Sequence, residues 1–262
     1  MASDQAGQKQ LVFYDIASGP PRRTFAPNPW KSRLALNFKS ASYSTNWVEL
    51  PDVTPTRQAL GIPVSRKLPN GQDFNTLPII YDSANKHYVG DSFDIAIYLD
   101  AKYPSAPRLI PAGAIGVTRA WNDRINDLFS RFVGLGSEGM PFNPANAEQC
   151  RQILVDRARI LTNRPEMTWQ DCIFRGEARV KMLADFKAAL GELEQYYASP
   201  DTSKGAFING EEPCYADMIV GGWLGMVHVT FSPEDLQQLH TWHNGRWGKI
   251  WKGLAPFTEI VE

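Results

Sequence analysis

The chain has 262 residues, of which 43% are hydrophobic and 21% are charged. This is the composition of an average folded protein, and it excludes wholesale disorder, a collagen-like fibre and a disulfide-dense miniprotein. The 27 basic and 28 acidic side chains leave a net charge of −1, so we expect no general affinity for nucleic acid. A chain of this length favours two modest domains.

The first hundred residues alternate between strand and helix patterns. The expected strands are residues 11–15, 46–51, 76–82 and 86–91. The expected helices are residues 31–40, residues 54–61 with Thr54 as N-cap, and a segment that begins at Asp91 or Ser92. A strand, a crossover helix and a parallel strand, followed by a hairpin, predict a small mixed sheet with helices packed on it.

The proline-rich residues 103–113 form the expected linker, and the pattern beyond them is helical. An apolar stripe predicts one long helix over residues 119–140; its members are Trp121, Ile125, Leu128, Phe132 and Leu135. Residues 214–229 are apolar on nearly all sides, which indicates a buried central helix. The sequence therefore predicts an α/β domain over residues 1–104 and an all-α domain over residues 112–262.

The cysteines and the N-terminal segment bear on location. Cys150, Cys172 and Cys214 stand far apart and have no metal-ligand spacing, so we expect neither a disulfide framework nor a metal site. The polar N-terminus lacks the apolar run of a secretory signal. No stretch approaches the ~20 apolar residues that span a bilayer. We therefore expect a cytoplasmic protein with no membrane partner.

Two segments have features that suit a ligand with peptide-like ends. Pro78 lies inside a strand pattern, where a proline indicates either an edge strand or a cis Leu77–Pro78 bond that turns the backbone of Leu77 toward an extended ligand. Taken alone, the segment around Pro78 favours the edge strand, because most X-Pro bonds are trans. Asp91 and Ser92 open a helix, whose free amides attract a carboxylate while Asp91 attracts an ammonium group. The simpler alternative is that both residues only cap their own helix.

A third segment, residues 25–32, leads into the first helix. Pro29 suits the first helical turn, which places Asn28 at the N-cap. The amides of this helix end would stabilise a thiolate placed beside Asn28. The alternative is that Asn28 is a cap only and that Trp30 packs in the core.

In order and spacing, these segments resemble the cytosolic glutathione transferases over nearly the whole chain. Leu77-Pro78, Asp91-Ser92 and the segment CYADMIV (214–220) carry the resemblance, although Cys214 replaces the usual Ser or Thr of the capping box that includes Asp217. The resemblance implies a thioredoxin-like N-terminal domain, a helical C-terminal domain, glutathione as co-substrate and a homodimer.

Residues 25–40 and 61–80 resemble in particular the fungal-specific class A transferases and the related bacterial lignin β-etherases. Many of these enzymes have a thiolate-activating serine where this chain has Ala26. Loss of one such hydrogen bond raises the pKa of the glutathione thiol by on the order of one to two units. We therefore expect Asn28, with the amides of the first helix, to provide the remaining activation; Thr24 and Ser32 are the other hydroxyls nearby.

The resemblance also implies the rest of the site. The expected glutathione-binding residues are Val64, Leu77, Pro78, Asp91, Ser92 and Lys67. Lys67 is one of four cations available for the glycine carboxylate; the others are Lys31, Arg33 and Arg66. The expected walls of the acceptor site are Trp30, Trp121, Phe129 and Phe132, with Met140 a further candidate.

Two functions remain open at this point. One is a transferase that conjugates glutathione to small aromatic or phenolic electrophiles, or cleaves them with it, in detoxification. The other is a binding protein that holds glutathione conjugates and polyphenols with little turnover, which Ala26 favours. Disulfide chemistry is not expected, because residues 28–31 lack a cysteine.

Overall fold

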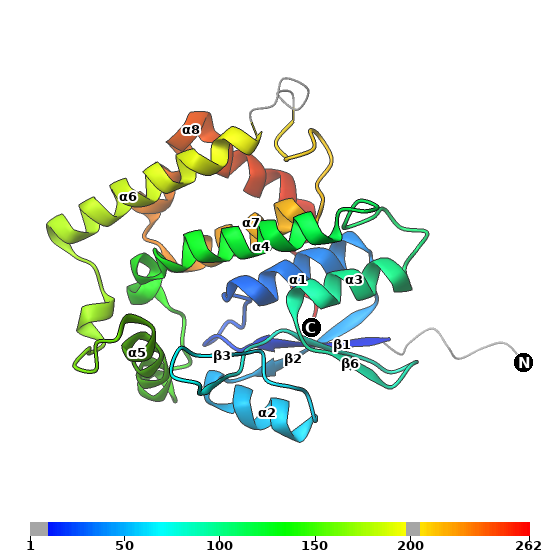
Figure 1. The fold of residues 1–262 in the computed structure, drawn as a ribbon, viewed down its shortest axis with the longest axis horizontal. Helices are drawn as coiled ribbons and strands as arrows, with labels where there is room; N and C mark the ends of the chain where they lie inside the picture. Colours follow the sequence, from blue (N-terminus) through cyan, green and yellow to red (C-terminus); the bar gives the residue numbers. More distant parts are fainter. Residues whose placement is uncertain (1–9, 198–204) are drawn as a thin grey trace, which may run out of the picture.

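The computed structural model describes residues 10–197 and 205–262. Residues 1–9 of the predicted first domain and residues 198–204 of the predicted second domain lie outside the described residues. The described chain forms a mixed sheet with helices on both faces, followed by a helical half that covers one of these faces (Figure 1).

The sheet has the strand order β2-β1-β5-β6. Its strands are β1 (Leu11–Ile16), β2 (Tyr43–Val48), β5 (Ile79–Asp82) and β6 (His87–Val89). β1 runs parallel to β2 and antiparallel to β5, which in turn pairs antiparallel with β6. A separate short hairpin consists of β3 (Arg66–Lys67) and β4 (Asp73–Phe74). The predicted crossover and hairpin are therefore both present.

Helices α1 (Pro27–Phe38) and α3 (Ser92–Lys102) lie on the face of the sheet that meets the helical half, whereas α2 (Val53–Ala59) lies on the other face (Figure 1). The helical half contains α4 (Ile115–Ser130), α5 (Ala147–Thr162), α6 (Gly176–Glu194), α7 (Tyr215–Thr230) and α8 (Pro233–Leu254). Short 3-10 turns are η1 (Leu50–Asp52), η2 (Val133–Gly139), η3 (Gln170–Cys172), η4 (Gln195–Tyr197) and η5 (Ala255–Phe257). The predicted class, a thioredoxin-like α/β part followed by an all-α part, is confirmed.

Helix α7 is the buried central helix that the sequence predicts. Its start is fixed by Asp217, whose carboxylate accepts hydrogen bonds from the amides of Cys214 at 3.0 Å and Ile208 at 2.8 Å. Glycines let α1 approach α7 closely: a Cβ on Gly222 would lie 2.5 Å from the carbonyl oxygen of Pro27, and one on Gly225 would lie 2.8 Å from the indole of Trp30. The close approach joins the two halves of the molecule.

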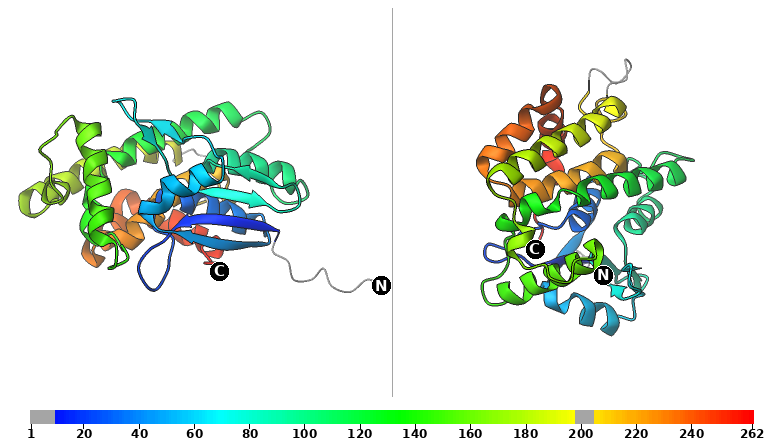
Figure 2. Two further views of the ribbon diagram at one scale, coloured as in Figure 1. Left: turned by 90° about the horizontal axis from the view of Figure 1, so that it is seen from below. Right: turned by 60° about the vertical axis from the view of Figure 1, so that its left-hand side comes forward.

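The last residues of the chain return to the sheet, beside the blue strands in the left view of Figure 2. The Asn37 amide donates to the carbonyl oxygens of Phe257 and Glu259, at 2.8 and 3.0 Å. Along β2, the Thr45 hydroxyl donates to the carbonyl oxygen of Val261. Residues 257–262 thus lie against α1 and β2, which is one of the two outer strands of the four-stranded sheet.

Several predicted element boundaries are wrong, among them the start of α1, which begins at Pro27 and not at residue 31. The second strand was expected at residues 46–51, but β2 ends at Val48 and a 3-10 turn containing Pro51 follows. Helix α2 has Asp52, not Thr54, at its N-cap position. The long helix expected over residues 119–140 ends at Ser130 and gives way to the glycine-rich turn η2.

The reason for the last difference is close packing against the end of α7. A Cβ on Gly136 would lie 2.5 Å from the Thr230 hydroxyl oxygen, and one on Gly139 would lie 2.0 Å from the Thr230 carbonyl oxygen. A regular helix with side chains there would collide with α7.

Within residues 10–197 and 205–262, no helix combines the length and the apolar character needed to cross a lipid bilayer.

Candidate functional site

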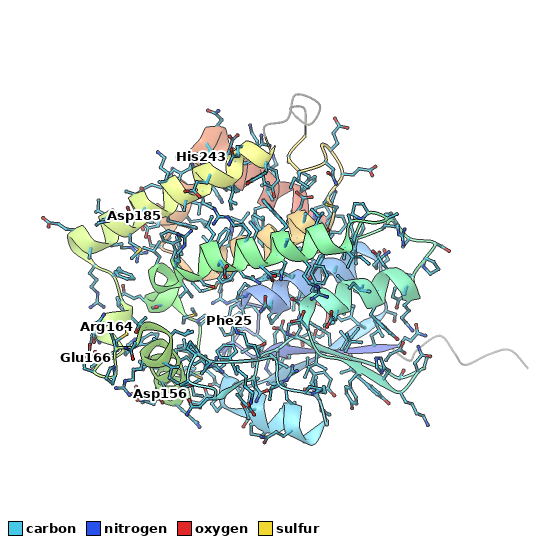
Figure 3. The ribbon with its side chains drawn as sticks, in the orientation of Figure 1. Phe25, Asp156, Arg164, Glu166, Asp185 and His243 are labelled. Carbon is cyan, nitrogen blue, oxygen red and sulfur yellow. The ribbon has the colours of Figure 1, made fainter. Side chains whose placement is uncertain are left out.

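A cavity of about 910 Å³ lies where the sheet half faces the helical half. Its lining comes from the loop before α1, the segment 60–66, the turn before β5, the start of α3, and the facing sides of α4, α5 and α7. Phe25, labelled in Figure 3, is one of the lining residues and packs edge-on against Phe142, with 6.4 Å between the ring centres. The volume is near the upper end of the ~300–1,000 Å³ usual for ligand pockets.

The Leu77–Pro78 peptide bond is cis, and Leu77 lines the cavity. Pro78 is buried, is not among the lining residues and lies directly before β5. Thr76, the residue before Leu77, also lines the cavity, and its carbonyl oxygen accepts a hydrogen bond from Arg57 at 2.9 Å. Of the two interpretations of Pro78, the cis bond is the one found.

Asp91 is the N-cap of α3 and Ser92 is its first helical residue, and both line the cavity. The Asp91 carboxylate accepts a hydrogen bond from the amide of Phe93 at 2.8 Å. The Ser92 carbonyl oxygen accepts a hydrogen bond from the hydroxyl of Tyr215 at 2.6 Å, which ties the first turn of α3 to α7. Capping does not exclude ligand binding here, because the second carboxylate oxygen of Asp91 and the free amides of the first turn remain available.

Arg57 on α2 connects the two segments, and sequence reasoning missed it. Its guanidinium, only 3% exposed, donates to the carbonyl oxygens of Thr76 and Gly90, at 2.9 and 3.1 Å, and also to that of Pro63. Burial lowers the pKa of Arg57, and the charge of Asp91 opposes this shift. Nothing in the local sequence distinguishes Arg57 from a solvated helix cation, because its partners lie in loops far along the chain.

Asn28 lines the cavity but is not the N-cap of α1. Ala26 holds that position, and Asn28 is the second helical residue. Pro27 and Pro29 have no N–H, and the amide of Trp30 bonds to the carbonyl oxygen of Ala26 at 3.1 Å. Of the first three helical residues, only Asn28 therefore has a backbone N–H that could stabilise a thiolate. Within the described part of the chain, the Asn28 side chain forms no hydrogen bond.

The other hydroxyls near Asn28 do not line the cavity. The Thr24 hydroxyl is fully buried, donating to the carboxylate of Asp15 at 2.5 Å and accepting from Arg33 at 2.6 Å. Arg33, one of the four cations considered for the glycine carboxylate, is itself buried and paired with Asp15 at 3.0 Å. Ser32 is also buried. None of these groups lines the cavity where Asn28 does.

The structure changes which cations can reach the glycine carboxylate of a ligand in the cavity. Lys67 is exposed, pairs with Asp73 and is not among the lining residues. Arg66 lines the cavity, as does Arg157 from α5. The guanidinium carbons of these two arginines lie 4.5 and 4.6 Å from the ring centre of the same residue, Phe74. Burial and the like charge of Arg66 lower the pKa of Arg157.

The four aromatic residues expected as acceptor walls do not line this cavity. Trp30 packs edge-on against Trp251 at 5.6 Å, and the Trp121 indole donates to the carbonyl oxygen of Ala216 at 3.1 Å. Phe129 stacks on Trp223 at 5.4 Å, and Phe132 lies 4.9 Å from Phe186. The apolar stripe of α4 faces α6 and α7 instead. The large apolar lining residues include Phe25, Met140, Phe142, Leu154, Trp223 and Met226.

Val64 lines the cavity, with 39% of its surface exposed. The cavity therefore brings together Asn28, Val64, Leu77, Asp91 and Ser92, and it leaves out Pro78 and Lys67. Among the residues that the structure describes, no group of three or more potential metal ligands occurs. The arrangement can hold an extended ligand whose head carries a carboxylate and an ammonium group. The apolar part of the cavity lies next to it.

Known proteins match both the sequence and the fold. Residues 162–257 match the family model described as the C-terminal domain of glutathione S-transferase. The glutathione S-transferase-like protein ustS of Aspergillus flavus is 25% identical over 276 residues, which cover 96% of this chain and 92% of that protein.

Two solved structures are similar over almost their full length. The glutathione S-transferase CsGST63524 of Ceriporiopsis subvermispora, solved in complex with glutathione, is 28% identical with a TM-score of 0.85, covering 96% of this chain and 99% of that chain. Glutathione transferase GSTFuA2 of Phanerochaete chrysosporium is 27% identical with a TM-score of 0.83, with the same coverage of 96% and 99%. The fold is that of the glutathione transferases, and the comparisons support a protein of that family.

Proposed function

We propose that the protein is a glutathione transferase that joins glutathione to small aromatic or phenolic electrophiles, or cleaves them with it, in detoxification. One observation carries the proposal: Asn28, Leu77 and the Asp91-Ser92 helix start line one cavity. The backbone of Leu77 offers a peptide-like partner to the cysteine of glutathione, and Asp91 with Ser92 offers partners to the γ-glutamyl head. The neighbouring apolar wall suits an aromatic acceptor.

The glycine carboxylate of glutathione is assigned to Arg66 and Arg157 in place of Lys67. An extended tripeptide with its head at Asp91 and its middle at Leu77 runs on toward Thr76 and Phe74, beside which both arginines lie. Neither arginine forms an ion pair with a carboxylate of the described residues, whereas Lys67 already pairs with Asp73. Two guanidinium groups without a counterion form a favourable site for an anion.

The reaction proposed is a displacement. The glutathione thiol loses its proton to solvent, the thiolate sulfur forms a bond to the electrophilic carbon, and the bond from that carbon to the leaving group breaks with its electron pair. The amide and side chain of Asn28 stabilise the thiolate, and the cavity orients the two reactants.

A second function, low-turnover binding of glutathione conjugates and polyphenols, has support from the start of α1. Ala26 offers no hydroxyl, and Pro27 and Pro29 offer no amides. Thiolate stabilisation at this helix end is therefore weaker than the family resemblance implies.

Calorimetry with glutathione, run beside a conjugation assay with 1-chloro-2,4-dinitrobenzene, tests the two functions. Saturable binding with glutathione-dependent turnover is the expected result. Binding without turnover favours the second function, and the absence of binding at millimolar glutathione rejects the first.

The finer assignments are also proposals. Residues 25–40 and 61–80 support the fungal-specific class A branch, related to the bacterial lignin β-etherases. By the same resemblance, we propose a cytoplasmic homodimer with glutathione as its co-substrate.

A further inference from the structure

A buried lysine lies behind the apolar part of the cavity. Lys31 on α1 is fully buried, and its ammonium nitrogen donates to the side-chain oxygens of Asn122 and Asn126 on α4, at 3.0 and 2.7 Å. No carboxylate among the described residues lies within ion-pair distance of it. Lysine is rarely fully buried without such a partner, because removing its charge from water is costly.

Asn126 carries the effect of this charge to the cavity, which it lines together with Asn122 and Trp223. Its side-chain oxygen accepts two hydrogen bonds, from Lys31 at 2.7 Å and from the indole of Trp223 at 3.0 Å. Both lone pairs of the amide oxygen are therefore used. The amino group of Asn126 forms no hydrogen bond with the described residues and remains as a donor.

The surroundings of Asn126 suit an aromatic ring. Trp223, stacked on Phe129, and Met226 provide apolar surface from α7, and Val133 provides it from η2. A polar donor with a positive charge behind it, set in an apolar wall, favours a ligand that combines a ring with a negatively charged oxygen.

We propose that the amino group of Asn126, oriented by Lys31 and Trp223, binds a negatively charged oxygen on an aromatic acceptor molecule, such as a phenolate or an aromatic carboxylate. The inference rests on the function proposed above and specifies its second substrate as an acidic aromatic compound. The site differs from the arginine pair at Phe74, which is assigned to glutathione itself.

The charge state of Lys31 gives an independent consequence. Burial lowers the pKa of Lys31 to about 7, against the opposing charges of Asp91 at the start of α3 and Asp123 on α4, while α7 faces Lys31 with Gly222. Lys31 is thus charged below this pH and neutral above it. The affinity for a permanently ionised ligand is expected to fall as the pH rises through about 7.

The test is the substitution Asn126→Asp, which keeps the shape, replaces the donor by a carboxylate oxygen and gives Lys31 a counterion. Calorimetry would compare 2,4-dinitrophenolate with its neutral methyl ether, 2,4-dinitroanisole, on protein saturated with S-methylglutathione. We expect Asn126→Asp to weaken phenolate binding by about tenfold or more and ether binding by less than about twofold. The pH dependence of phenolate binding is expected to disappear as well.

The control Asn70→Asp adds the same charge in an exposed turn and keeps the hydrogen bond that Asn70 accepts from Gln72. It is expected to change neither affinity. Equal losses for both ligands, no loss for either, or no binding of either ligand to the natural protein would overturn the proposal. A shift in the pKa of the glutathione thiol without a change in phenolate affinity would also overturn it, by assigning Asn126 to the thiolate. Failure to bind S-methylglutathione would instead count against the proposed function, and the ligand comparison would still be made on the free protein.

Discussion

At the scale of single residues, Asn28 is the test of thiolate stabilisation. In Asn28→Ala, the backbone amide remains but the side-chain donor is lost. We therefore expect the pKa of the thiol of bound glutathione to rise and turnover to fall about tenfold. The thiolate absorbance in the ultraviolet, titrated against pH, measures the first effect. Asn70→Ala, in an exposed turn outside the cavity, is the control, and an unchanged titration in Asn28→Ala would remove Asn28 from the mechanism.

A second residue-scale prediction concerns the glycine carboxylate. Arg157→Gln is expected to weaken glutathione binding by about tenfold, because a charge-assisted hydrogen bond contributes about 1.5–3 kcal/mol. The loss should vanish when the ligand is the glycine ethyl ester of glutathione, which has no charge at that end. Lys67→Gln serves as the matched control. A penalty that is equal for the acid and the ester would contradict the assignment.

At the scale of elements, the last two helices of the C-terminal half, α7 and α8, differ in how they begin. The carboxylate of Asp217 serves two backbone donors before α7, whereas the Ser232 hydroxyl serves the single amide of Asp235 at the start of α8, at 3.2 Å. Asp217→Ala is expected to lower the free energy of unfolding by about 2–4 kcal/mol, and Ser232→Ala by about 1 kcal/mol. Urea unfolding measures both. Equal losses would show that the second bond of Asp217 is unimportant.

The elements also show what the sequence can predict. The start of α3 is predictable because Asp91 caps it with a bond to Phe93 two residues away. The start of α1 was misplaced because Asn28 is a common cap, whereas the backbone begins the helix at Pro27 without any side-chain cap. Lys31 and Arg33 were candidates for the glycine carboxylate, since nothing near them in sequence indicates that they are buried. Their partners come from α4 and β1, and no local pattern contains those contacts.

At the scale of the whole molecule, His228 makes stability depend on pH. Burial lowers its pKa to about 4, its ring stacks on Trp251 at 4.4 Å, and its Nε2 lies 2.9 Å from that of His240. As the pH falls below about 6.5, the unfolded chain takes up this proton first, so stability is lost between about 6.5 and 4. His228→Gln is expected to reduce this loss by on the order of 1–3 kcal/mol, while exposed His87→Gln leaves it unchanged.

Protonation of Asp217 has the opposite effect on stability over part of the same pH range. Burial raises its pKa to about 6, although the hydrogen bonds from Cys214 and Ile208 oppose the shift. The folded chain therefore takes up this proton first as the pH falls from about 6 toward 3.8, which adds stability. Unfolding of His228→Gln followed across this range separates the two contributions, and an unchanged acid slope would show that His228 is not responsible.

The attachment of residues 257–262 to α1 and β2 has a consequence for the order in which the protein is made. An outer strand of a sheet invites pairing with other chains. On the ribosome, β2 is made long before the segment that bonds to its Thr45 side chain, so these contacts form only after residues 257–262 have been synthesised. Removing the final six residues would abolish these contacts, and we expect the damage to appear as aggregation during expression before any change in the cavity.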